Sequence, residues 1–167
     1  QRAAHLLNLE LPVACESHVK VALRDFVSAM PADAPLLCWM DPVTLPWSDE
    51  EREALSEDPR MAHLLKPFPA GVHGRPSGQP GHHYALMLWT YDIEPSEPVF
   101  PLEWDPHLPE VIVRGMSKML PGMKNYFEPL PRMTVDGGYY CKTPENRPLV
   151  GPLPIEGAFV SAAYSGF

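Results

Sequence analysis

Short segments in which hydrophobic and polar residues alternate, or in which apolar residues run together, dominate the chain. Alternation with a period of two places every second side chain on the same face, as in a half-buried strand. A short, uninterrupted apolar and aromatic run indicates a fully buried strand. These two patterns predict strands at 18–24, 34–40, 84–91, 135–140, 148–150 and 158–164.

Helical spacing is clearest in residues 109–120, where Ile112, Met116 and Met119 keep one face apolar and Pro121-Gly122 follows. A second helix is predicted after Ser48, because Ser48 and Glu51 have the spacing of a capping box. This acidic helix is expected to stop near Glu57, and Asp58-Pro59 predicts another short helix after it. Further local signals predict the end of a helix at 3–9 and a glycine-rich loop or hairpin end at 70–83.

The order of these elements predicts an α+β fold, with a mostly antiparallel mixed sheet and a few helices on one face. We expect the sheet to carry 18–24, 84–91 and 135–140, with helix 109–120 packed against it. The chain has 167 residues, of which 45% are hydrophobic and 20% charged. These values are typical of a globular domain large enough to bury a core.

Charge and missing motifs exclude several classes of function. A formal net charge of -8 argues against nucleic-acid and anionic-membrane partners, and no apolar run reaches the length that spans a bilayer. No Gly-x-Gly occurs, so the dinucleotide fingerprint and the P-loop are absent. The histidines lack metal-ligand spacing, and we expect no metal site. Three widely spaced cysteines indicate a reducing, intracellular setting, most simply the cytoplasm.

The segment 137–152, GGYYCKTPENRPLVGP, resembles the Thr-Pro-Asp-x-x-Pro-x-Ile-Gly signature of the D-amino-acid-oxidase-like FAD oxidoreductases. That superfamily includes glycine oxidase, monomeric sarcosine oxidase and dimethylglycine dehydrogenase. Residues 157–167 are similar to the strand ending in Ser-Gly that follows the signature in this family. Leu120-Pro121-Gly122 and Leu11-Pro12-Val13 are also similar to family segments.

The resemblance implies an internal fragment of a flavoenzyme. Residues 1–152 would be a substrate-binding domain of the D-amino-acid-oxidase type, and residues 153–167 a strand returning to an FAD-binding domain whose N-terminal part is missing here. The parent would oxidise a C–N bond of a small amine or (N-alkyl) amino acid, with hydride transfer to FAD. Sarcosine oxidase binds its flavin covalently through a cysteine where Gly138 stands here, so the resemblance implies non-covalent FAD.

The resemblance also implies roles for individual residues. Tyr140 and Lys142 are the candidate catalytic groups, because they lie just before Thr143-Pro144. Tyr139 and Tyr140 would face the substrate, as would His18 and Lys20 on the first strand. Flavin contacts are implied for Asn146, Arg147, Pro148, Ser165, Gly166 and Phe167.

Each of these residues also has a purely structural interpretation. The tyrosines would pack the sheet, Lys142 would be a solvated strand lysine, and Arg147 would be a turn residue in a salt bridge. His18 and Lys20 would then belong to a polar outer face. At the level of the whole chain, the alternative is a non-catalytic α+β domain that binds a ligand or a protein partner.

Overall fold

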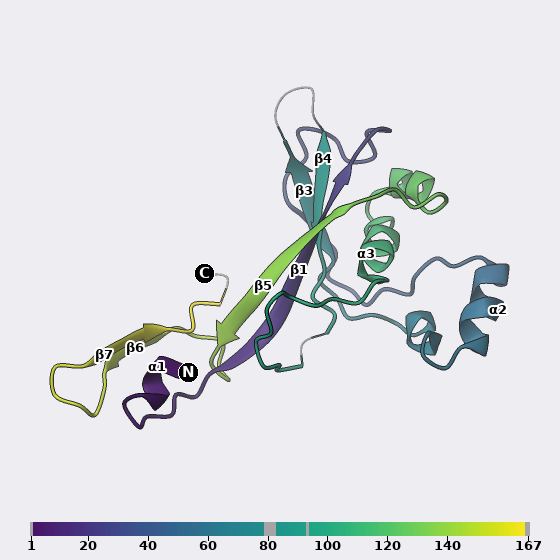
Figure 1. The fold of residues 1–167 in the computed structure, drawn as a ribbon. Coiled ribbons are helices and arrows are strands. Elements are labelled where there is room, and N and C mark those ends of the chain that lie inside the picture. Colours follow the sequence, from purple (N-terminus) through teal and green to yellow (C-terminus); the bar gives the residue numbers. More distant parts are fainter. Residues whose placement is uncertain (1, 79–82, 93, 166–167) are drawn as a thin grey trace. The chain divides into compact units, whose positions relative to one another are not determined.

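The computed structural model describes residues 2–78, 83–92 and 94–165. Its strands form a five-stranded sheet in the order β2-β3-β4-β1-β5 and a two-stranded sheet of β6 and β7. The antiparallel pairing and the few helices confirm the predicted α+β class. The elements (Figure 1) are α1 (Arg2–His5), β1 (Ala14–Arg24), β2 (Leu37–Cys38), α2 (Asp49–Glu57), the 3-10 helix η1 (Ala62–Leu65), β3 (His73–Ser77), β4 (Tyr84–Leu88), α3 (Leu108–Met116), the 3-10 helix η2 (Pro121–Tyr126), β5 (Thr134–Lys142), β6 (Leu149–Pro152) and β7 (Phe159–Ala162).

The chain divides into two compact units. The first unit comprises Gln1–His18, Asp92–Glu103 and Gly137–Phe167, and the second comprises Val19–Tyr91 and Trp104–Asp136. Strands β1 and β5 each contribute residues to both units. The expected boundary after residue 152 falls inside the first unit.

The core of the second unit lies between its antiparallel strands and α3. In β1, Val21 and Leu23 are fully buried, and they pair with Met87 and Ala85 of β4. Helix α3 packs closely here, because Gly115 presents its backbone to the ring of Trp89. A Cβ atom added at Gly115 would lie 2.4 Å from that ring. The predicted strands 18–24 and 84–91 and the packing of helix 109–120 on the sheet are thereby confirmed in outline.

The capping box at the start of α2 is also confirmed. The Ser48 hydroxyl accepts a hydrogen bond from the Glu51 amide at 3.1 Å, and a Glu51 carboxylate oxygen accepts one from the Ser48 amide at 2.7 Å. The helix ends at Glu57, as its sequence predicts. Both partners lie within one turn of each other, which is why this feature is readable from sequence.

Several predicted boundaries were wrong. A loop or hairpin end was expected at 70–83; residues 73–77 are instead a strand of a hairpin with β4, so the hairpin alternative was right and its bounds were too wide. Pro76 is tolerated because it lies beyond the two residue pairs that join β3 to β2. After α2, the Asp58 carboxylate binds the amide and guanidinium of Arg60, and the next helix starts later than Pro59. Helix α3 ends at Met116 instead of residue 120, and α1 ends at His5 instead of residue 9. Of the strand predicted at 34–40, only two residues are in a strand. Strand β7 ends before Ala163, whose φ is 58°, although the prediction reached residue 164.

Candidate functional site

Four polar side chains meet on one face of β1 and β5 in the first unit, and we call them the polar cluster: Glu16, His18, Tyr140 and Lys142. Alternation along each strand places both of its members on the same face. The His18 ring stacks on the Tyr140 ring, with centroids 3.9 Å apart and an interplanar angle of 15°. Lys142 Nζ donates a hydrogen bond to Glu16 Oε2 at 2.5 Å, and His18 Nε2 lies 3.6 Å from the same oxygen.

The side chains of the polar cluster are largely buried but still reach solvent, and this burial strengthens their interactions. The exposed side-chain fractions are 18% for Glu16, 17% for His18 and 20% for Lys142. At this depth the charges interact more strongly than on an open surface, although water still screens them. The cluster therefore offers an ammonium group, an imidazole and a phenol to a small ligand, with one carboxylate that balances the ammonium charge.

Three of the four members were singled out from sequence, namely His18, Tyr140 and Lys142. The structure brings them together, and their roles toward a substrate stay predictions. Glu16 was missed. Strand β1 begins at Ala14, earlier than the predicted 18–24, but Glu16, Ser17 and His18 are all polar, so no hydrophobic alternation signalled this extension. Extending the strand by two residues would have placed Glu16 on the same face as His18.

Two other predicted substrate residues lie elsewhere. Tyr139 points to the opposite face from Tyr140, where its hydroxyl accepts a hydrogen bond from the Val99 amide at 3.0 Å and donates one to the Val99 carbonyl at 3.2 Å. Lys20 belongs to the second unit, where its Nζ lies 2.9 Å from a carboxylate oxygen of Asp136. Neither contact tests a role in substrate binding.

The signature segment forms a tight turn between β5 and β6. Buried Thr143 closes it, since its hydroxyl donates to the Arg147 carbonyl at 2.8 Å and accepts from the Arg147 amide at 3.0 Å. Asn146 has a φ of 52°, a left-handed conformation that asparagine tolerates. Arg147 and Pro148 are exposed at the end of the turn. These two local hydrogen bonds explain why a threonine stands at this position of the motif.

The second motif ends close to the first. The Ser165 amide donates a hydrogen bond to the Cys141 carbonyl at 3.2 Å, so the end of the chain's last described segment lies beside β5. Ser165 has a φ of 56°. The other two predicted flavin contacts in this motif, Gly166 and Phe167, lie outside the described residues.

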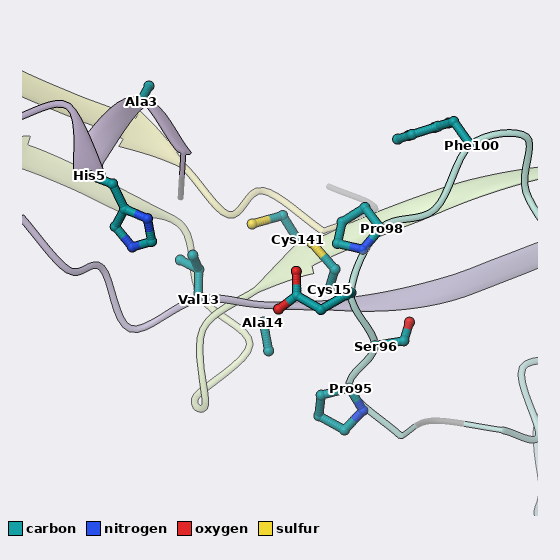
Figure 2. A pocket seen from close by; sticks show the side chains of 11 residues that line it. Ala3, His5, Val13, Ala14, Cys15, Pro95, Ser96, Pro98, Phe100 and Cys141 are labelled. Carbon is teal, nitrogen blue, oxygen red and sulfur yellow. The ribbon is translucent and has the colours of Figure 1, made fainter.

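A cavity of about 810 Å³ also lies in the first unit (Figure 2). It opens among α1, the start of β1, the end of β5 and the proline-rich segment 95–100. None of the residues predicted to form the site lines it. Its walls are formed by Ala3, His5, Val13, Ala14, Cys15, Pro95, Ser96, Glu97, Pro98, Phe100 and Cys141.

No protein-family model, curated protein or solved structure matches the chain. Within the described ranges, no group of three or more His, Cys, Asp or Glu side chains is placed to hold a metal ion. None of the described helices is long and apolar enough to cross a membrane. The polar cluster and the motif turn that follows it are therefore the features that can indicate a function.

Proposed function

We propose that the chain is the substrate-binding part of an FAD-dependent oxidoreductase that oxidises a C–N bond of an amine or (N-alkyl) amino acid. The observation that supports this most directly is the position of the polar cluster. Tyr140 and Lys142 stand at the end of β5, immediately before the Thr143-Pro144 turn whose sequence resembles the family signature. In the proposal, the substrate site and the turn that contacts the cofactor therefore adjoin along the chain.

In this proposal the cluster recognises the polar end of the substrate. The Lys142 ammonium attracts a carboxylate, and Glu16 keeps the ammonium in place through its 2.5 Å hydrogen bond. The Tyr140 hydroxyl donates a second hydrogen bond, while the stacked His18 ring restricts the orientation of the phenol. An amino acid with a free carboxylate suits this arrangement better than a simple amine, because it can interact with both the ammonium and the hydroxyl.

The described residues fit contact with one edge of a flavin ring and no more. Arg147 offers an exposed guanidinium at the end of a turn that Thr143 holds closed, and positive charge there would favour the electron-rich edge of a reduced flavin. When bound, FAD would supply the hydride acceptor. Gly138 carries no nucleophile, which suits non-covalent binding. In the proposal, a separate N-terminal domain with a βαβ unit holds the FAD pyrophosphate.

The proposal that FAD binding requires a separate N-terminal domain can be tested by titrating FAD into the 167-residue chain and into the polypeptide of the complete reading frame. We expect weak or no quenching of flavin fluorescence by the chain alone and stoichiometric binding by the complete polypeptide. Tight binding by the chain alone would contradict the proposal. A complete polypeptide that neither retains nor binds FAD would favour the non-catalytic binding domain instead.

The role of the cluster is tested by Tyr140→Phe in the complete polypeptide. The stacked ring is retained, so flavin content and stability should stay unchanged. Loss of a hydrogen bond to a charged substrate group should lower kcat/KM for the best substrate by roughly ten- to a hundredfold, which corresponds to about 1.5–3 kcal/mol. The rate of anaerobic flavin reduction by a panel of N-methyl and primary amino acids measures this.

Tyr84→Phe is the matched control, because Tyr84 lies on β4 in the second unit. Both variants lose one phenolic oxygen, and only Tyr140→Phe should lose rate. If Tyr140→Phe binds flavin fully and is reduced at the wild-type rate, Tyr140 is a packing residue and the proposed substrate contact is wrong.

A further inference from the structure

Cys15 and Cys141 share a face of the first unit. Strands β1 and β5 are neighbours in the sheet, and the Glu16–Lys142 and His18–Tyr140 contacts show that they run antiparallel. Because side chains alternate, the odd-numbered cysteines point to the face opposite the polar cluster. Both cysteines line the cavity (Figure 2), so two thiols from distant parts of the sequence meet in one solvent-accessible space.

The two thiols are close enough to interact. Burial raises the pKa of the Cys15 thiol, and Cys141 raises it further through its charge and through a side-chain hydrogen bond. Strand β1 begins at Ala14 and β5 ends at Lys142, so antiparallel pairing of these two strand ends puts Cys15 opposite Cys141. Opposite residues of such a pair have Cα atoms about 4.5–5.5 Å apart. That separation lies within the roughly 4.4–6.8 Å that a disulfide bridges. The strand geometry therefore suits a direct bond between the two sulfur atoms with little backbone movement.

Access favours a small oxidant. Cys15 and Cys141 are both half-buried, and the cavity of about 810 Å³ in front of them admits small molecules. Cys38, the third cysteine, is exposed in the second unit, where its thiol lies 3.4 Å from Met40 Sδ. Cys15 and Cys141 thus form a pair of neighbouring thiols, and Cys38 serves as an internal control.

We propose that Cys15 and Cys141 form a redox-active dithiol that hydrogen peroxide converts into an intramolecular disulfide. One thiolate attacks a peroxide oxygen, the O–O bond breaks, and the products are a cysteine sulfenic acid and one water molecule. The second thiol then attacks the sulfenic sulfur, the S–S bond forms, and the S–O bond breaks to release another water molecule. Two thiols are oxidised to one disulfide and one peroxide is reduced to two waters.

This dithiol does not depend on the proposed flavin chemistry, so it is tested on the 167-residue chain without FAD. The folded chain is treated with hydrogen peroxide, and its remaining thiols are alkylated and counted by mass spectrometry. Three free cysteines before treatment should become one, and a non-reducing digest should contain a peptide that joins Cys15 to Cys141. Dithiothreitol should restore all three thiols.

Three variants make the result specific. Cys38→Ser should still form the disulfide and leave no alkylatable thiol, whereas Cys15→Ser and Cys141→Ser should form none and should accumulate a sulfenic acid that a dimedone probe traps. Circular dichroism confirms that each variant is folded before it is oxidised. Oxidation of Cys15 and Cys141 to separate sulfinic acids, a disulfide that involves Cys38, or three thiols that all survive treatment would each overturn the proposal.

Discussion

Replacing Arg114 with methionine should destabilise the second unit strongly. The Arg114 side chain is only 2% exposed. Its guanidinium donates to Glu110 Oε1 at 2.9 Å, to the Pro46 carbonyl at 2.8 Å and to both carboxylate oxygens of Glu51, and it lies 3.8 Å from the centroid of the Trp47 ring. This one side chain therefore joins α3 to α2 and to the segment before it.

The size of the effect follows from what the substitution leaves behind. Methionine keeps much of the apolar contact but removes every hydrogen-bond donor. Breaking a buried ion pair typically costs about 3–5 kcal/mol. The side chains of Glu51 and Glu110 are 39% and 25% exposed, so water can partly rehydrate their carboxylates. We therefore expect a loss near the lower limit, about 3 kcal/mol, which is a large share of the roughly 5–15 kcal/mol that stabilises a typical domain.

Urea denaturation followed by tryptophan fluorescence measures this loss as a shift of the transition midpoint at constant m-value. Arg60→Met is the matched control. Arg60 also forms an ion pair, with Asp58, but its side chain is 88% exposed, and such surface pairs contribute little. If Arg114→Met shifts the midpoint no more than Arg60→Met does, the buried guanidinium does not hold α2 and α3 together.

Two further substitutions probe the same unit. Gly115→Ala should lower the free energy of unfolding by about 1–3 kcal/mol, because the new methyl group would overlap the Trp89 ring, and an unchanged denaturation midpoint would show that α3 can move away from the ring without cost. Tyr126→Phe should cost about 1.5–3 kcal/mol, because the phenol donates a buried hydrogen bond to Asp25 Oδ1 at 2.6 Å. Burial and this hydrogen bond raise the pKa of Tyr126, so its contribution to stability is complete below the unfolded pKa of about 10 and is lost as pH rises through the higher folded pKa. A wild-type chain that loses no more stability at alkaline pH than Tyr126→Phe does would contradict this assignment.

Local patterns predicted those parts of the fold that depend on neighbours along the chain. The capping box at Ser48 and Glu51 requires only one helical turn, and the strand at 84–91 is visible in its own apolar run. Boundaries were less accurate where a tertiary contact decides them. The loop or hairpin end expected at 70–83 contains the whole of β3, because strands on both sides supply hydrogen-bond partners, which no local pattern reveals.

The candidate site, too, was predicted from the sequence only in part. The resemblance of the Thr143-Pro144 motif to the family signature singled out His18, Tyr140 and Lys142 one by one. Their assembly depends on the pairing of β1 with β5, which brings together residues as far as 126 positions apart, as in the Glu16–Lys142 hydrogen bond. Glu16 and the Cys15–Cys141 pair therefore became visible only in the tertiary structure.

The amino-acid sequence by itself determined the fold class and most of the strands, because periodicity and turn chemistry are local properties. It also pointed to three members of the polar cluster, through the resemblance of its motif to a family signature. The tertiary structure decided which strands are neighbours, which face each side chain occupies and where a cavity opens. The physical reason is that strand pairing and register depend on contacts between distant segments, whose gain in buried surface and hydrogen bonds no single segment encodes.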